Sequence, residues 1–320
     1  MDSSKKETVD IMEEDQMQYV LKTNNLSKYY GKFKALENLN MTIPKGAIYG
    51  FVGKNGAGKT TLIRLLCGLQ LPTSGTFEML GIQNSSKEIY QARKQMGAIV
   101  ETPALFMDMT AESNLKQQYL NIGLPSYDGI KELLQLVGLE NAGTKKVKNF
   151  SLGMRQRLGI AIALCGNPDF IILDEPINGL DPQGIIEIRE LIIKLNRDKG
   201  ITVLISSHIL DELSKLATHY GFIDGGRMIK EMSAQELENT YRKSIRMKVS
   251  DTGILAEIMD ERGIEYSILD DTTADVYAEL KFSELAQDFA QKGCEIISME
   301  MQEESLESFY LSLVGGNSHV

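Results

Sequence analysis

The sequence predicts an α/β protein with a parallel core sheet, followed by a smaller α+β domain. Three strand-like segments between residues 170 and 226 are separated by two helical ones, and repeated β-α-β units form parallel sheets with helices on both faces. An apolar strand at 47–53 leads into a glycine-rich loop and a helix. After residue 244 the order becomes β-α-β-β-α-β, which predicts a separate domain.

The composition is typical of a globular protein, since 42% of its 320 residues are hydrophobic and 24% are charged. The three cysteines, Cys67, Cys165 and Cys294, lie far apart, which argues against disulfides or a zinc site. A formal charge of −10 argues against nucleic acid as a partner. Residues 1–18 are polar and acid-rich and are expected to form a flexible leader. No apolar run is long enough to span a bilayer, so no direct membrane insertion is expected.

The elements of the first domain follow from their periodicity. Alternating residues over 19–45 predict antiparallel strands, and the run 47–53 predicts a buried strand. Segment 108–142 has two helical stretches separated by Gly123 and Pro125, within a helical insert of about 104–165. The first domain is expected to cover residues 19–240. Its remaining predicted strands are 170–175, 201–207 and 220–226.

The second domain is expected over residues 244–320. The β-α-β-β-α-β order is that of ferredoxin-like domains. Its last segment has apolar residues at helical spacing, at Leu306, Phe309, Tyr310 and Leu313. We expect an amphipathic helix there, packed on its own domain or on a partner.

A glycine-rich stretch, GKNGAGKT at 53–60, satisfies the phosphate-binding pattern G-x-x-x-x-G-K-[ST]. It stands after a strand and before a helix, as that P-loop requires. Glycines let backbone amides approach phosphate oxygens, Lys59 reaches the β- and γ-phosphates, and the Thr60 hydroxyl binds Mg²⁺. The sequence therefore predicts a bound nucleotide together with Mg²⁺, and the family resemblance described below implies that the nucleotide is ATP. The expected nucleotide-binding residues of this segment are Gly53, Asn55, Gly56, Ala57, Gly58, Lys59, Thr60 and Thr61.

Two carboxylates end the predicted strand FIILDE. Asp174 is expected to hold the metal, and Glu175 to orient and polarise the attacking water. The alternative is a solvated acidic pair at the end of a strand. The P-loop upstream favours the catalytic interpretation.

Five motifs, in their order along the chain, indicate a family. They are the P-loop, FSLGM at 150–154, ILDEP, GLD at 179–181 and SSH at 206–208. Because these five motifs occur together and in this order, the sequence resembles an ATP-binding cassette (ABC) protein over roughly residues 20–240. The resemblance implies that Ser151 and Gly153 contact the γ-phosphate held by a second copy. It also implies that Asp181 crosses the dimer interface, that His208 hydrogen-bonds the γ-phosphate and that Tyr30 stacks on adenine. Leu152 and Met154 depart from the family's glycine and glutamine.

A dimer is also expected on physical grounds, because the P-loop with its two carboxylates lacks a cluster of donors for the transition state. The helix that begins near Ser151 can supply that cluster from a partner. ATP would then hold two subunits together, and hydrolysis would release them.

In GAIVETPALF, residues 97–106, an apolar run that reaches Val100 is expected to form a further buried strand, and Glu101 follows it. The ABC resemblance places it where the family has a glutamine that reaches the metal and the water, and where the membrane permease docks. Glu101 is therefore expected as a metal ligand and catalytic residue, and its loop as a permease contact together with the helical insert. The alternative is a glutamate turned out to water.

The strings DEPINGLDPQGIIEIREL and VETPALF and the small second domain resemble the bacitracin-resistance and lantibiotic-immunity branch of exporter ATPases. This resemblance implies an ATPase that drives export of an antibiotic or antimicrobial peptide through a separate permease. The chain would lie in the cytoplasm, on the inner face of the cell membrane. The alternatives are the ATPase of a solute importer and a soluble, non-transport ABC ATPase.

Overall fold

The computed structural model describes residues 19–240, 244–278, 282–302 and 305–315. These residues form two compact units that divide between Ala234 and Gln235. The leader expected over residues 1–18 lies outside the described residues.

A six-stranded sheet forms the centre of the first unit, in the order β10-β9-β3-β8-β7-β6. Its five strands from β9 to β6 are parallel, and β10 runs antiparallel to β9 at the edge. Every residue of β3, β7 and β8 is buried, as expected for strands covered on both faces. The strands are β3 (Ile48–Val52), β6 (Met96–Ile99), β7 (Phe170–Asp174), β8 (Thr202–Ser207), β9 (His219–Asp224) and β10 (Arg227–Ser233).

A second, four-stranded antiparallel sheet has the order β2-β1-β4-β5. It shares one hydrophobic core with the central sheet, in which Leu26 and Met41 join Phe51, Leu62 and Phe170. The alternating pattern over residues 19–45 thus correctly predicted the hairpin of β1 and β2. The strands are β1 (Tyr19–Tyr30), β2 (Phe33–Pro44), β4 (Ser74–Met79) and β5 (Ile82–Gln83).

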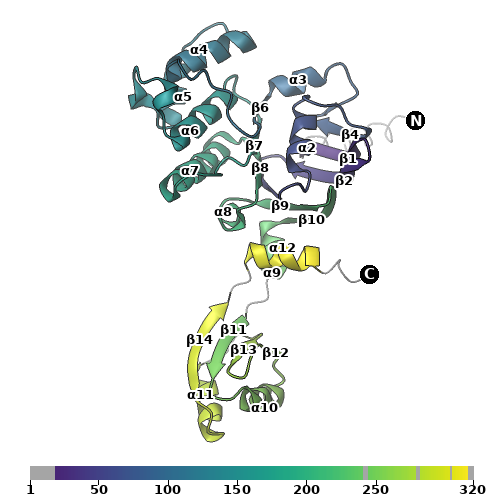
Figure 1. Cartoon of the computed structure of the whole chain (residues 1–320), viewed down its shortest axis with the longest axis vertical. Helices are drawn as coiled ribbons and strands as arrows, with labels where there is room; N and C mark the ends of the chain where they lie inside the picture. Colours follow the sequence, from purple (N-terminus) through teal and green to yellow (C-terminus); the bar gives the residue numbers. More distant parts are fainter. Residues whose placement is uncertain (1–18, 241–243, 279–281, 303–304, 316–320) are drawn as a thin grey trace, which may run out of the picture. The chain divides into compact units, whose positions relative to one another are not determined.

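Three helices of the first unit, α4, α6 and α7, begin at residues whose side chains cap them. Thr110, Ser151 and Asp181 each accept a hydrogen bond from a backbone N–H of the helix that follows. Figure 1 shows α4, α5 and α6 grouped beyond β6, on the side away from α2 and the antiparallel sheet. The helices are α2 (Lys59–Leu66), α3 (Ile89–Lys94), α4 (Ala111–Ile122), α5 (Ile130–Leu136), α6 (Leu152–Ala163), α7 (Pro182–Lys199) and α8 (Leu210–Ser214), with 3₁₀ turns at Glu140–Ala142 and Val147–Asn149.

The second unit contains a four-stranded antiparallel sheet in the order β12-β13-β11-β14. With one helix after β11 and one after β13, this is the ferredoxin-like plan. Met247 and Val249 pack with Leu255, Ile258 and Phe289 in its core. Its elements are β11 (Ser244–Val249), α10 (Thr252–Arg262), β12 (Tyr266–Ile268), β13 (Thr273–Val276), α11 (Phe282–Gln291), β14 (Ile296–Gln302) and α12 (Leu306–Gly315), preceded by α9 (Ala234–Thr240).

The expected terminal helix is α12. Leu306, Phe309 and Tyr310 are buried, while Leu311 on another side of the helix is exposed. Three of the four residues of the predicted apolar face are therefore covered in the single chain, and the fourth, Leu313, is half-buried.

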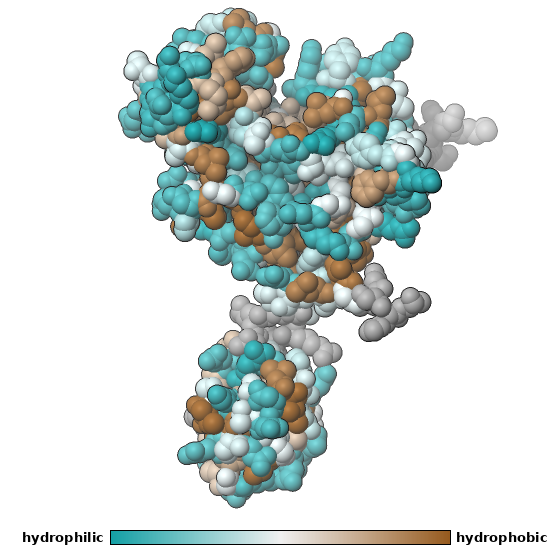
Figure 2. All heavy atoms as spheres, viewed as in Figure 1, coloured by the Kyte–Doolittle hydropathy of each residue, from teal (hydrophilic) through white to brown (hydrophobic). Residues whose placement is uncertain are grey.

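Among the described residues, no helix combines the length and apolar character needed to cross a membrane. Figure 2 shows hydrophobic residues in small groups, interrupted by hydrophilic ones, over the visible face of both units.

Candidate nucleotide-binding site

The loop between β3 and α2 takes the shape that its glycines permit. Gly56 and Gly58 have φ angles of 83° and 113°, which side chains with a Cβ rarely adopt. A Cβ on Gly58 would also lie 2.6 Å from the carbonyl oxygen of Ala35. The backbone of this loop is therefore specified by residues without side chains, as the P-loop pattern predicts.

This loop forms one wall of a cavity of about 540 Å³. The other walls come from the start of β2, from the end of β7 and from the segment after β8. Gly53 and Ala57 are not in the lining, and Ala57 is buried in the core instead. The lining residues are Phe33, Ala35, Asn55, Gly56, Gly58, Lys59, Thr60, Thr61, Glu175, Asn178 and His208.

Lys59 is the buried cation of this cavity, with 6% of its surface exposed. Its Nζ donates hydrogen bonds to the carbonyl oxygens of Gly53 and, at 3.4 Å, of Lys54, and it lies 3.4 Å from Glu175 Oε1. Burying an ammonium group requires such partners. Phosphate oxygens form stronger, charge-assisted hydrogen bonds than neutral carbonyls, so an incoming phosphate can take over these contacts.

Asp174 is almost completely buried at the end of β7, with 1% of its surface exposed. Its Oδ1 accepts a hydrogen bond from Ser206 Oγ at 2.5 Å. Its Oδ2 is buried and has no hydrogen-bond partner among the described residues. A buried carboxylate oxygen without a partner is costly, and a hydrated cation is a group that would satisfy it. This oxygen therefore fits a ligand of Mg²⁺. Asp174 itself is not in the cavity lining, which contains Thr60, the second expected protein ligand.

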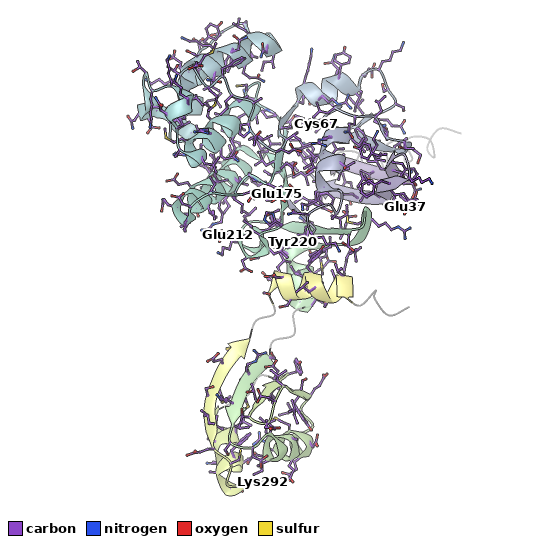
Figure 3. All side chains as sticks on the ribbon, in the orientation of Figure 1. Glu37, Cys67, Glu175, Glu212, Tyr220 and Lys292 are labelled. Carbon is purple, nitrogen blue, oxygen red and sulfur yellow. The ribbon has the colours of Figure 1, made fainter. Side chains whose placement is uncertain are left out.

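Glu175 follows Asp174 with a φ of 50°, in the left-handed region. Its backbone N–H donates to Ser206 Oγ at 3.0 Å, and its Oε2 lies 2.7 Å from His208 Nδ1. Lys59 approaches its other oxygen. In the view of Figure 3, Glu175 lies between the group of helices α4 to α7 and the α2 side of the unit. The structure thus brings Lys59, Glu175 and His208 together, as the motifs predicted.

Ser206 is a site residue that sequence reasoning did not assign. The parallel register pairs it with Asp174, and its hydroxyl contacts both Asp174 and the Glu175 amide. The motif SSH was recognised only for its histidine. The signal that was available is a hydroxyl at the carboxyl end of the strand that neighbours FIILDE.

The aromatic residue at the cavity is Phe33, whereas Tyr30 is not part of the lining. Both side chains belong to the β1–β2 hairpin, where the two residues pair across the turn. The Tyr30 hydroxyl donates to Gln70 Oε1. Stacking of Tyr30 on adenine stays a prediction, and Phe33 is a second candidate for that contact.

Ser151, Gly153 and Asp181 do not line the cavity. Ser151 Oγ accepts from Met154 N at 3.2 Å, and Asp181 Oδ1 accepts from Gly184 N at 3.0 Å, so each caps its own helix. A Cβ on Gly153 would have no neighbour closer than 3.9 Å. The surface at the start of α6 is thus open to an approaching group.

Glu101 also lies outside the cavity lining. Its φ is 62°, 59% of its side chain is exposed, and its Oε1 forms an ion pair with Arg64 Nη2 of α2. The side chain is exposed, as the alternative interpretation held, but it has a cationic partner. Its role as a metal ligand stays a prediction. Within the described residues, no group of three or more His, Cys, Asp and Glu side chains is arranged to hold a metal.

The sequence matches relatives along almost its whole length. Residues 36–178 match the model of the ABC transporter family. The bacitracin transport ATP-binding protein BcrA of Bacillus licheniformis is 40% identical, over 94% of this chain and 99% of BcrA. The lantibiotic transport ATP-binding protein SrtF of Streptococcus pyogenes is 46% identical, over 69% of this chain and 93% of SrtF.

Solved structures agree with the first unit. CbiO1 from Clostridium perfringens, part of an ABC transporter complex, has a TM-score of 0.63 at 29% identity, over 70% of this chain and 92% of CbiO1. The dimeric cassette MJ0796, in a post-hydrolysis state with ADP and Pi, has a TM-score of 0.61 at 25% identity, over 67% of this chain and 98% of that one. With this cavity, these relatives and this fold, the chain belongs to the ABC transporter family, as an ATP-binding and ATP-hydrolysing subunit.

Proposed function

We propose that this chain uses ATP to drive a separate membrane permease that exports an antibiotic or antimicrobial peptide. The observation that carries the proposal is the likeness to BcrA, whose name assigns it to bacitracin transport, over 94% of this chain. The part of this chain that matches BcrA therefore extends beyond the ATPase core into the second unit. SrtF, named for lantibiotic transport, supports the same class of cargo.

Within the cavity, each residue has a chemical task. Lys59 and the P-loop amides would bind the phosphates, and Thr60, with Asp174 from outside the lining, would hold Mg²⁺. Mg²⁺ held there would neutralise part of the charge of the phosphates. Glu175 orients and polarises the attacking water, and its contact with His208 keeps both side chains beside the γ-phosphate position.

A second copy of the chain completes the site in this proposal. Ser151, Gly153 and Asp181 are absent from the lining of the chain's own cavity, which is expected of residues that act on a partner's nucleotide. The open start of α6 offers backbone amides and the positive end of a helix to a γ-phosphate. ATP between two such surfaces would hold the dimer closed, and hydrolysis would release it.

The permease would dock on the Glu101 loop and the helical insert. Several large apolar side chains are exposed there, which is typical of a surface that binds another protein. The chain would thereby be held on the inner face of the cell membrane, with no nucleic acid involved. The exposed apolar residues of this surface are Phe106, Met107, Met109, Leu120 and Ile122.

The test is to purify the chain with its permease, reconstitute both in vesicles, and measure ATP hydrolysis with bacitracin or a lantibiotic added. We expect one of these peptides to stimulate hydrolysis and to be moved in an ATP-dependent way, and Glu175→Gln to abolish both effects. Hydrolysis that responds to neither peptide but to a small solute moved in the opposite direction would reject export in favour of import.

A further inference from the structure

The loop that carries Glu101 contacts three parts of the first unit. Val100 packs against the core shared by the two sheets. Glu101 pairs with Arg64, in the last turn of α2. Pro103 lies so close to α6 that a Cβ on Gly159 would meet its Cγ at 2.6 Å. The loop therefore connects the helix that follows the P-loop with the helix that begins at the Ser151 cap.

Arg64 stands one turn along α2 from Thr60. Residues four apart share one face of a helix, and four residues advance about 6 Å along its axis. Arg64, which holds the Glu101 carboxylate, thus lies one helical turn from the residue whose hydroxyl is expected to bind Mg²⁺. If Glu101 is a metal ligand, its carboxylate must leave Arg64 to reach the metal.

We propose that Arg64 is a positioning residue that holds Glu101 in a resting place, and that nucleotide-bound Mg²⁺ must compete with Arg64 for the carboxylate. This inference rests on the proposed role of Glu101 as a metal ligand. It assigns to Arg64 the task of setting how readily the loop responds to Mg²⁺ and nucleotide.

Two properties of the Arg64–Glu101 pair would allow Mg²⁺ to replace Arg64 as the partner of Glu101. Both side chains are partly exposed, 37% for Arg64 and 59% for Glu101, and ion pairs in such positions are weak. The φ of 62° at Glu101 is uncommon for a residue with a Cβ and persists only where its surroundings hold it. A weak partner and a constrained backbone together make a loop that a divalent cation can displace.

Exchange of Arg64 for Mg²⁺ as the partner of Glu101 would also affect α6. Pro103 is two residues from Glu101 and abuts Gly159 without room for a methyl group. A shift of the loop must therefore displace α6 or lose this contact, because packed interiors resist compression. Since α6 begins at the Ser151 cap, the change of partner at Glu101 reaches the surface proposed to meet the second copy.

The first experiment is a double-mutant cycle on the full chain, with Glu175→Gln present throughout so that ATP persists. The Mg²⁺ concentration that half-saturates binding of a fluorescent ATP analogue is measured for Arg64→Gln, Glu101→Gln and both together. We expect Arg64→Gln to lower this concentration about two- to fivefold, the range set by exposed ion pairs. The matched control Arg64→Lys keeps the charge and should stay near the parent value.

In the Glu101→Gln background, Arg64→Gln should have no effect, because no carboxylate remains for Arg64 to hold. An unchanged Mg²⁺ requirement in Arg64→Gln, or an equal change in both backgrounds, would overturn the role of Arg64. If instead Glu101→Ala leaves the Mg²⁺ requirement at the parent value, the ligand role of Glu101 is wrong, and Arg64 loses its assignment with it. Binding of ATP itself is judged separately, by Lys59→Ala.

A second readout follows the loop without any catalysis. The chain contains no tryptophan, so Phe106→Trp, at a half-exposed position of the same loop, provides a single probe. We expect Mg²⁺ with ATP to shift the emission of this probe, and Arg64→Gln to move the nucleotide-free emission part of the way to that value. Nucleotide-free spectra that coincide with and without Arg64 would count against a resting position set by Arg64.

Discussion

Replacing Ser206 by alanine would remove the one hydroxyl that, among the described residues, donates a hydrogen bond to the buried Asp174 carboxyl group. Ser206 Oγ donates to Asp174 Oδ1 at 2.5 Å and accepts from the Glu175 N–H at 3.0 Å. A hydrogen bond to a charged group contributes about 1.5–3 kcal/mol, and a lost bond between neutral groups about 1 kcal/mol. Because the Glu175 N–H keeps a second acceptor, the Ser206 carbonyl at 3.2 Å, only the first of these terms counts, and we expect Ser206→Ala to cost about 1.5–3 kcal/mol of unfolding free energy.

The neighbouring serine provides a matched control. Ser207 is equally buried, but its hydroxyl contacts only backbone groups, the N–H of Ile209 at 2.9 Å and the carbonyl of Ile209 at 3.4 Å. Ser207→Ala should therefore cost about 1 kcal/mol. Urea unfolding of both variants without nucleotide or Mg²⁺ makes the comparison. Equal losses for Ser206 and Ser207 would refute the reasoning that the Ser206 hydroxyl contributes more because it binds the buried Asp174 carboxyl group.

The remaining predictions concern three other residues, Lys59, Glu212 and Cys67. Lys59→Ala should abolish binding of ATP, and an unchanged affinity in a binding titration would reject the P-loop assignment. Hydrogen bonds from Lys215 and Arg189 lower the pKa of Glu212, so its contribution to stability is present above the ordinary pKa of 4.5 and is lost as the pH falls through the lowered value. Glu212→Gln should thus cost about 0.5–1 kcal/mol at neutral pH and nothing in acid, which unfolding at both pH values would check. Burial raises the pKa of the Cys67 thiol to about 11, with Asp174 adding to the effect, so iodoacetamide at pH 8 should spare it in the native chain and modify it in denaturant.

The phosphate-binding part of the site could be predicted from sequence because its signals are local. A glycine pattern, the strand before it and the helix after it lie within about 20 residues, and backbone rules connect them directly. Asp174 and Glu175 were predictable for the same reason, since both end one apolar run. Parallel strands then bring their carboxyl ends to one edge, so Lys59, Glu175 and His208 meet.

Contacts that depend on side-chain direction could not be predicted. Tyr30 and Phe33 flank the same turn, and only the twist and register of the hairpin decide that Phe33 faces the cavity. The Arg64 partner of Glu101 comes from a helix 37 residues earlier, and no periodicity connects the two. The edge strand β10 was also missed, because its charged, half-exposed residues break the apolar pattern by which strands were recognised.

Glu175→Gln tests the central claim most directly, because it removes the charge that polarises water and leaves the side chain's shape in place. The measurement is ATP turnover of this variant beside the parent chain, with light scattering to follow association when ATP and Mg²⁺ are added. The account predicts that the variant binds ATP, associates into dimers and hydrolyses ATP at least about a hundredfold more slowly. Turnover at the parent rate, or no association with ATP bound, would contradict it.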